Sequence, residues 1–224
     1  MMGRIKMAHD WDFRGAESSL SRALELSPGN TDVLRIAAAL AKAQGRLEEA
    51  IGLWRRTVEQ DPLSGLADTN LGLALHCLGR FSDAESAYQK ALELAPQRGG
   101  TRALLAQTLL ALKRGEEALA EAAREPEEAF RLWALAVVHH VVGNGAKSDT
   151  ALREFIDKYA EGGALQVAEI YGARGDVDAA FDWLERAYAQ RDGGVIEMKT
   201  STLLRSLHGD PRWGAFLKKM GLED

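Results

Sequence analysis

Residues Gly65 to Arg98 read GLADTNLGLALHCLGRFSDAESAYQKALELAPQR, and this stretch decides the fold. Two apolar segments of helical length are separated by Gly79-Arg80-Phe81, and the second segment ends before Pro96. Glycine suits the turn because it adopts backbone angles that other residues avoid, and proline cannot continue a helix. The stretch therefore predicts two helices joined by a tight turn.

The same pattern recurs every 34 residues in the first half of the chain. Prolines close three successive units, and a small residue and then a large one precede each proline at fixed offsets. These positions are Pro28, Pro62 and Pro96; Ala16, Ala50 and Ala84; and Leu20, Trp54 and Tyr88. A helix pair of this length cannot bury its apolar face alone, so neighbouring pairs must stack and leave a long concave surface.

The unit Gly65 to Arg98 resembles the tetratricopeptide repeat (TPR) family at nearly every signature position. The matching residues are Leu71, Gly72, Gly79, Ala84, Tyr88, Ala91 and Pro96. The resemblance implies an all-α fold, a right-handed superhelical TPR solenoid of antiparallel helix pairs.

We expect a single solenoid over residues 1–224. It comprises a partial repeat at 1–30, repeats at 31–64, 65–98, 99–128, 129–160 and 161–194, and a C-terminal cap at 195–224. The first unit lacks room for a complete first helix, so either the chain is cut from a longer protein or this helix is a frayed cap. Later units drift: Lys113 replaces the turn glycine, and Pro126 cuts a helix short.

The tail carries the signature of an amphipathic capping helix. Asp210-Pro211 suits the start of a helix, and Trp213, Phe216, Leu217 and Met220 fall on one face. We expect this helix to cover the apolar side of the last unit, because a solenoid needs capped ends.

Composition excludes several classes of protein. The net charge of −5 disfavours nucleic-acid binding, and no stretch approaches the ~20 apolar residues that span a membrane. The start of the chain lacks a signal peptide, which favours a cytoplasmic location. The lone Cys77 rules out an internal disulfide framework and a cysteine zinc site.

No catalytic residues, metal ligands or cofactors are expected. His139 and His140 are adjacent, and neighbouring helix residues point about 100° apart, so they do not share one ion. No Ser/His/Asp arrangement is visible, and the carboxylates fall on solvated helix faces. The sequence predicts a protein that is not an enzyme.

TPR proteins line their concave face from fixed positions on the first helix of each repeat. Carrying these positions over predicts a partner-binding groove that contains Arg35, Lys42, Thr69, Leu73, His76, Gln107, Leu110, Phe130, Trp133, Val137, His140, Leu165 and Glu169. Its middle is apolar, which favours a peptide or amphipathic helix, with Trp133 as the anchor. Alternatively, Trp133 packs against the neighbouring unit, or the groove is filled by a missing segment of this protein or by self-association.

These patterns are consistent with two functions. The first is a protein–protein interaction scaffold. The second rests on the stretches 168–171, 183–188 and 203–211, through which residues 159–222 resemble the C-terminal end of a bacterial TPR group. That resemblance implies the regulatory or sensory part of a larger signalling protein, which carries a winged-helix regulator, a nucleotide cyclase or a kinase.

Overall fold

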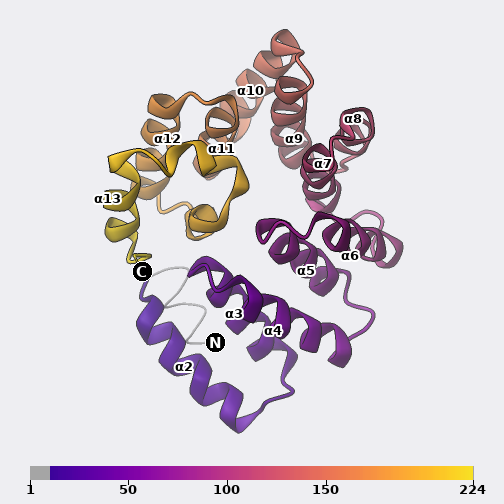
Figure 1. Ribbon diagram of the computed structural model, residues 1–224, viewed down its shortest axis with the longest axis vertical. Helices are drawn as coiled ribbons and strands as arrows, with labels where there is room; N and C mark the ends of the chain where they lie inside the picture. The colour runs from indigo at the N-terminus through magenta and orange to yellow at the C-terminus, as the bar shows by residue number, and fades with distance from the viewer. Residues whose placement is uncertain (1–10, 224) are drawn as a thin grey trace.

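The computed structural model describes residues 11–223, and these residues form helices joined by short turns, with no strand among them (Figure 1). The first helix expected for the partial repeat, within residues 1–10, lies outside the described residues. The elements are α2 (Phe13–Leu26), α3 (Thr31–Ala43), α4 (Leu47–Gln60), α5 (Gly65–Cys77), α6 (Phe81–Leu94), α7 (Thr101–Ala111), α8 (Gly115–Ala123), α9 (Glu128–Val141), α10 (Gly145–Tyr159), α11 (Ala164–Arg174), α12 (Val177–Ala189), the 3-10 helices η1 (Gly193–Thr200) and η2 (Thr202–Leu207), and α13 (Pro211–Met220).

Consecutive helices pack as pairs, from α3 against α4 to α11 against α12, and the pairs stack into the superhelix. Ala16, Ala50 and Ala84 are fully buried where helices approach closely. A Cβ added to Gly72 would lie only 2.8 Å from Cε1 of Tyr88, so the contact between α5 and α6 requires glycine. The small residues that recur every 34 positions are thus those at which neighbouring helices are in close contact.

The turns within the pairs need a left-handed backbone. Gly79 and Gly143 adopt φ values of 86° and 81° at these turns. Lys113 stands at the same point between α7 and α8 and has φ of 62°, a conformation that is strained for a residue with a side chain. The repeat keeps its geometry here despite the loss of glycine.

Two shorter helices receive their N-terminal caps from distant carboxylates. Glu125, which is fully buried, accepts hydrogen bonds from the backbone N–H groups of Gly100 (2.9 Å) and Ala103 (3.3 Å) at the start of α7. Asp192 accepts one from Leu165 N–H (3.0 Å) at the start of α11. Because α8 ends before Pro126, Glu125 can reach the N-terminus of α7 and cap it. If α8 continued without a break, Glu125 would lie within that helix and not at this N-terminus.

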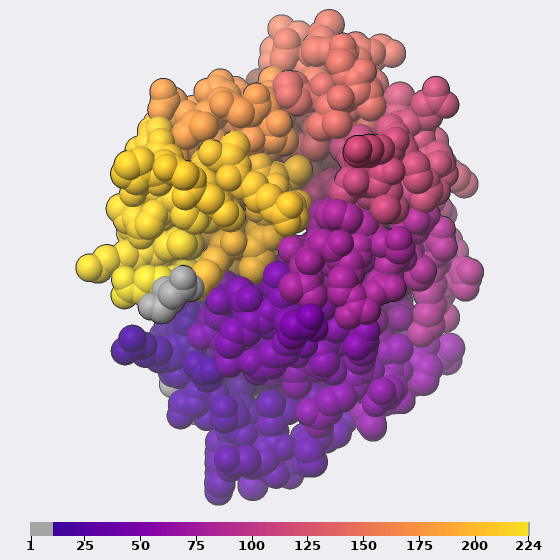
Figure 2. Space-filling view, viewed as in Figure 1, coloured from indigo at the N-terminus to yellow at the C-terminus, as the bar shows by residue number. Residues whose placement is uncertain are grey.

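The superhelix curves until its two ends meet (Figure 1). One buried apolar cluster combines residues of α2 and α3 with residues of α12 and α13, among them Phe13, Leu184 and Phe216. The rings of Trp11 and Tyr188 lie 4.9 Å apart. In Figure 2 the C-terminal part lies directly against the N-terminal helices. The tail helix α13 therefore covers α12 and also packs in the apolar cluster that joins the C-terminal helices to the N-terminal helices α2 and α3.

Residues of the tail contact residues that lie 34 positions earlier in the chain, although the tail lacks the sequence pattern of the repeat. Ser206 bonds to the carbonyl of Gly172 (2.7 Å), and Arg212 and Lys219 pair with Asp178 (2.8 Å) and Glu185 (2.5 Å). Each of these pairs is 34 residues apart. Residues 193–220 thus occupy the place of a further repeat, with 3-10 turns in place of its first helix.

Replacing Lys113 by glycine should raise the free energy of unfolding by about 0.5–1 kcal/mol. Relief of ~1–2 kcal/mol of left-handed strain exceeds the ~0.5–1 kcal/mol of extra chain entropy that glycine loses. Thermal and urea unfolding measure the change. The reverse control, Gly79→Lys, has open space around its Cβ and should destabilise through backbone strain alone. A Lys113→Gly protein less stable than wild type would contradict the assignment of strain to this turn.

Candidate functional site

The concave face holds a central cavity of about 300 Å³ between the inner helices of the superhelix and the tail. Leu66, Leu73, Leu104, Phe130 and Leu165 form much of its apolar wall. Nine residues of the sequence-predicted groove line it: Lys42, Thr69, Leu73, His76, Gln107, Phe130, Trp133, Leu165 and Glu169. These residues come from five different inner helices, so the family positions did bring distant side chains to one place.

The remaining four predicted residues lie elsewhere. Leu110 and Val137 line a second cavity of about 350 Å³ on the concave face. Arg35 and His140 line neither cavity, and Arg35 pairs with Asp32 one helical turn away (2.9 Å). The predicted groove is therefore divided, and its ends are not part of the central cavity.

The division is made by residues 193–207, which we call the strap. The strap comprises η1 and η2, packs against α3 and α11, and contributes Glu197, Thr200, Ser201 and Thr202 to the wall of the central cavity. Its apolar side chains Val195, Met198 and Leu204 are fully buried. The open concave groove expected from the sequence is thus occupied, and the occupant is a C-terminal segment of the same chain.

Sequence reasoning missed the strap residues and also missed Arg98 and Gln166. The family positions concern only the first helix of each repeat, whereas Arg98 lies in the loop between α6 and α7. Residues 193–207 carry no helical period by which to place them. The unusual Gly193-Gly194 pair was the available signal, because it permits the chain to turn onto the concave face.

An ion pair between a buried lysine and a partly exposed glutamate joins the strap to α3. Lys42 is almost fully buried, and its ammonium contacts the carboxylate of Glu197 on η1. Burial lowers the pKa of Lys42, while the neighbouring Cys77 and Glu169 act in the opposite direction. Because removing Glu197 would leave the buried Lys42 charge unpaired, loss of the strap from this position would be costly.

Glu169 of α11 is the second polar anchor of the strap. Ser201 donates a hydrogen bond to its carboxylate (2.6 Å), and Lys42 lies nearby. Burial raises the pKa of Glu169 to about 7, because the charged form loses its hydration, and Asp192 adds to the increase. The Ser201 hydroxyl, Lys42 and the Trp133 indole oppose the increase without cancelling it.

His76 forms part of the wall between the two cavities. Its Nδ1 lies 2.8 Å from the Thr108 hydroxyl and its Nε2 lies 2.9 Å from the hydroxyl of Thr202 on the strap. Burial lowers the pKa of His76 to about 4, and Arg205 contributes to the decrease. A neutral imidazole held at both nitrogens positions the strap and is not free to transfer protons.

Trp133 combines the two roles that the sequence left open. It lines the central cavity beside Phe130, with ring centroids 6.4 Å apart, yet only 6% of its surface is exposed. It also belongs to the main apolar core. An alanine at this position would cost about 3–5 kcal/mol of packing, so it would not isolate a binding role.

The described residues offer little support for a metal site, a reactive cysteine or a membrane-spanning helix. Among residues 11–223, no group of three histidine, cysteine or carboxylate side chains is arranged to hold a metal ion. Burial raises the pKa of the Cys77 thiol, which makes it a poor nucleophile at neutral pH. None of the helices described here is both long and apolar enough to cross a membrane.

Replacing Glu169 by glutamine should remove a pH dependence of stability. The folded protein holds the Glu169 proton up to about pH 7, whereas the unfolded chain releases it near the ordinary pKa of 4.5. The stabilisation from this group is therefore complete below about pH 4.5 and is lost as the pH rises to about 7. The wild-type free energy of unfolding, measured relative to Glu169→Gln, should fall across this interval.

Urea unfolding of both proteins between pH 4.5 and 8 measures the difference, in which contributions from His76 cancel. Glu161→Gln, which alters an exposed glutamate, is the matched control and should show no such trend. If the difference in the free energy of unfolding between wild type and Glu169→Gln stays constant with pH, the pKa of Glu169 is not raised in the folded protein.

Comparison with known proteins identifies the repeat. Models described as tetratricopeptide repeat match residues 12–64, 37–99 and 78–136, which together extend over more than half of the chain. Small glutamine-rich tetratricopeptide repeat-containing protein 2 of Mycosarcoma maydis is 33% identical over 85 residues, 38% of this chain. The chain spans only 24% of that relative's length.

Solved structures share the architecture at low sequence identity. PilW, a widely conserved type IV pilus biogenesis factor, has a TM-score of 0.63 at 18% identity, over 92% of this chain and 94% of PilW. MamA has a TM-score of 0.58 at 18% identity, over 70% and 94% of the two chains. A thermophilic TPR protein of Thermus thermophilus has 0.59 at 18% identity, over 78% and 98%. The family models and the shared superhelix agree, and the chain belongs to the tetratricopeptide repeat family.

Proposed function

We propose that the protein is a non-enzymatic interaction module that receives a short segment of a protein partner in the central cavity. The fold of the TPR family supports an interaction scaffold. The observation that supports this site is the convergence of five inner helices and the strap on one apolar-walled cavity. A cavity with apolar walls and a few polar groups is the usual form of a ligand site.

The size of the cavity limits the partner segment. An α-helix with its side chains is about 10–12 Å across, and the strap already packs on α3 and α11 where such a helix would lie. A volume of about 300 Å³ accommodates the side chains of a few residues. Of the two ligands expected from the sequence, a peptide or an amphipathic helix, we therefore propose a short peptide segment with an apolar anchor.

The candidate reactive side chains among the described cavity-lining residues are held in contacts that favour binding over catalysis. His76 has both ring nitrogens within hydrogen-bond distance of threonine hydroxyls, and Lys42 is paired with Glu197. The alternative function, as the regulatory part of a bacterial signalling protein, is not favoured, because the matching families and relatives are themselves repeat proteins.

Filling the cavity should abolish peptide binding without unfolding the protein. Leu73 is half-buried in the cavity wall, so Leu73→Trp places a larger ring in the space that the partner would occupy. Peptides selected by the wild-type protein from a displayed random-peptide library should bind Leu73→Trp at least ~10-fold more weakly, or about 1.4 kcal/mol. Isothermal titration with the synthetic peptides measures the affinities.

Leu63→Trp provides the control, since Leu63 is 78% exposed and lies outside the cavity. Circular dichroism checks that both variants keep their helix content. If the wild-type protein selects no peptides, or if folded Leu73→Trp binds them with unchanged affinity, the proposed function is wrong.

A further inference from the structure

The central cavity shares three lining residues with a more open surface, which we call the shelf. The shelf consists of Ala95, Pro96, Gln97, Arg98, Gly99, Glu127 and Phe130. Arg98, Gly99 and Phe130 line the cavity and the shelf alike. The cavity and the shelf therefore adjoin at the loop between α6 and α7, over which a bound polypeptide would extend.

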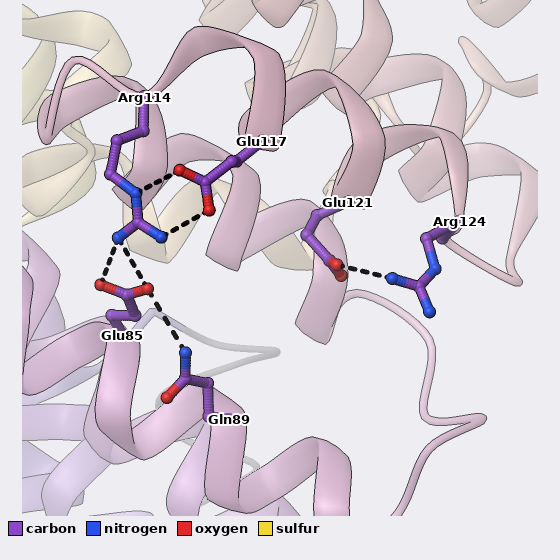
Figure 3. A network of polar contacts seen from close by, with 6 residues as sticks. All are labelled: Glu85, Gln89, Arg114, Glu117, Glu121 and Arg124. Atoms are coloured by element: carbon purple, nitrogen blue, oxygen red, sulfur yellow. Dashed lines mark hydrogen bonds and ion pairs between the residues drawn. The ribbon is translucent and has the colours of Figure 1, made fainter.

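Arg98 lies at this junction with an unsatisfied guanidinium. Within residues 11–223 its side chain makes no hydrogen bond or ion pair, and its Nε is shielded from solvent. The arginines of the neighbouring helices differ. Arg102 pairs with Glu121 (2.5 Å), and Arg114 binds Glu85 (2.8 Å) and Glu117 (2.7 Å), as Figure 3 shows for Arg114.

A further donor of the cavity lining also lacks an acceptor. Gln107 Nε2 is buried without a hydrogen-bond partner. Unpaired buried donors are costly, and here Gln107 and Arg98 line the same cavity. An occupant rich in acceptor oxygens would satisfy them.

The charges inside the cavity favour a negative group at Arg98. The Lys42 ammonium is already neutralised by Glu197, and the Glu169 carboxyl accepts a hydrogen bond from Ser201. Arg98 therefore remains the uncompensated charge among the described lining residues. Guanidinium groups bind carboxylates in a two-pronged geometry, which adds direction to the attraction.

We infer that the partner segment places an apolar side chain in the cavity and an adjacent carboxylate on Arg98, while its flanking residues cross the shelf. The inference rests on the proposed function. The carboxylate belongs either to an Asp or Glu side chain or to the C-terminus of the partner. An apolar anchor beside an acidic group is a simple recognition pattern that peptide selection can detect.

The test repeats the peptide selection with Arg98→Gln, which keeps a polar side chain of similar length but removes the charge. Wild type should enrich peptides that carry a carboxylate next to an aromatic or aliphatic residue. Arg98→Gln should still select apolar anchors but lose the acidic preference, and it should bind the wild-type peptides ~10-fold more weakly. Arg153→Gln makes the same charge change at an exposed arginine of α10 and should behave as wild type.

Synthetic peptides separate the two sources of the carboxylate. Replacing a C-terminal acid by an amide weakens binding only if the terminus contacts Arg98, and Asp→Asn or Glu→Gln in the peptide does so only for a side-chain contact. Enriched peptides without acidic groups, or unchanged binding by Arg98→Gln, would overturn the inference and leave the proposed function intact. If neither protein selects any peptide, or if folded Leu73→Trp keeps full affinity, the proposed function fails, and the inference fails with it.

Discussion

The contact between the strap and the inner helices is the constraint on which the concave face depends. Stacked helix pairs alone would leave an open groove along the superhelix. Here residues 193–207 cross that groove. Glu197 forms an ion pair with Lys42 of α3, and Ser201 donates a hydrogen bond to Glu169 of α11. Together with the apolar cluster shared by the two ends of the chain, these contacts close the superhelix and reduce the groove to separate cavities.

The repeat architecture could be predicted because helix pairing leaves a local trace. Close contacts require small residues such as Gly72 and Ala84 at fixed spacing, and the turn needs a residue like Gly79. The strap could not be predicted, because it lacks periodicity and its partners lie far away in sequence; Lys42 and Glu197 are 155 residues apart. Family positions located much of the cavity wall, but the loop residue Arg98 fell outside them.

In the second half of the chain, the repeat pattern is irregular where individual residues cap a helix or form a turn. Glu125 caps α7 only because α8 stops early, and Asp192 performs the same role for α11 just before the chain turns into the strap. The missing glycine at Lys113 is tolerated as a strained left-handed residue. The two capping carboxylates lie beside the cavity, because they bind the backbone N–H groups of Gly100 and Leu165, which line it.

A double-mutant cycle between Lys42 and Glu197 tests most directly whether the strap is bound into the concave face. The free energies of unfolding of Lys42→Met, Glu197→Gln and the double variant yield the coupling energy between the two positions. We expect Glu197→Gln to be destabilised and the coupling to exceed ~1 kcal/mol, because this variant leaves the buried Lys42 charge without its partner, whereas the double variant does not. Additive effects, with no measurable coupling, would contradict a strap docked on α3.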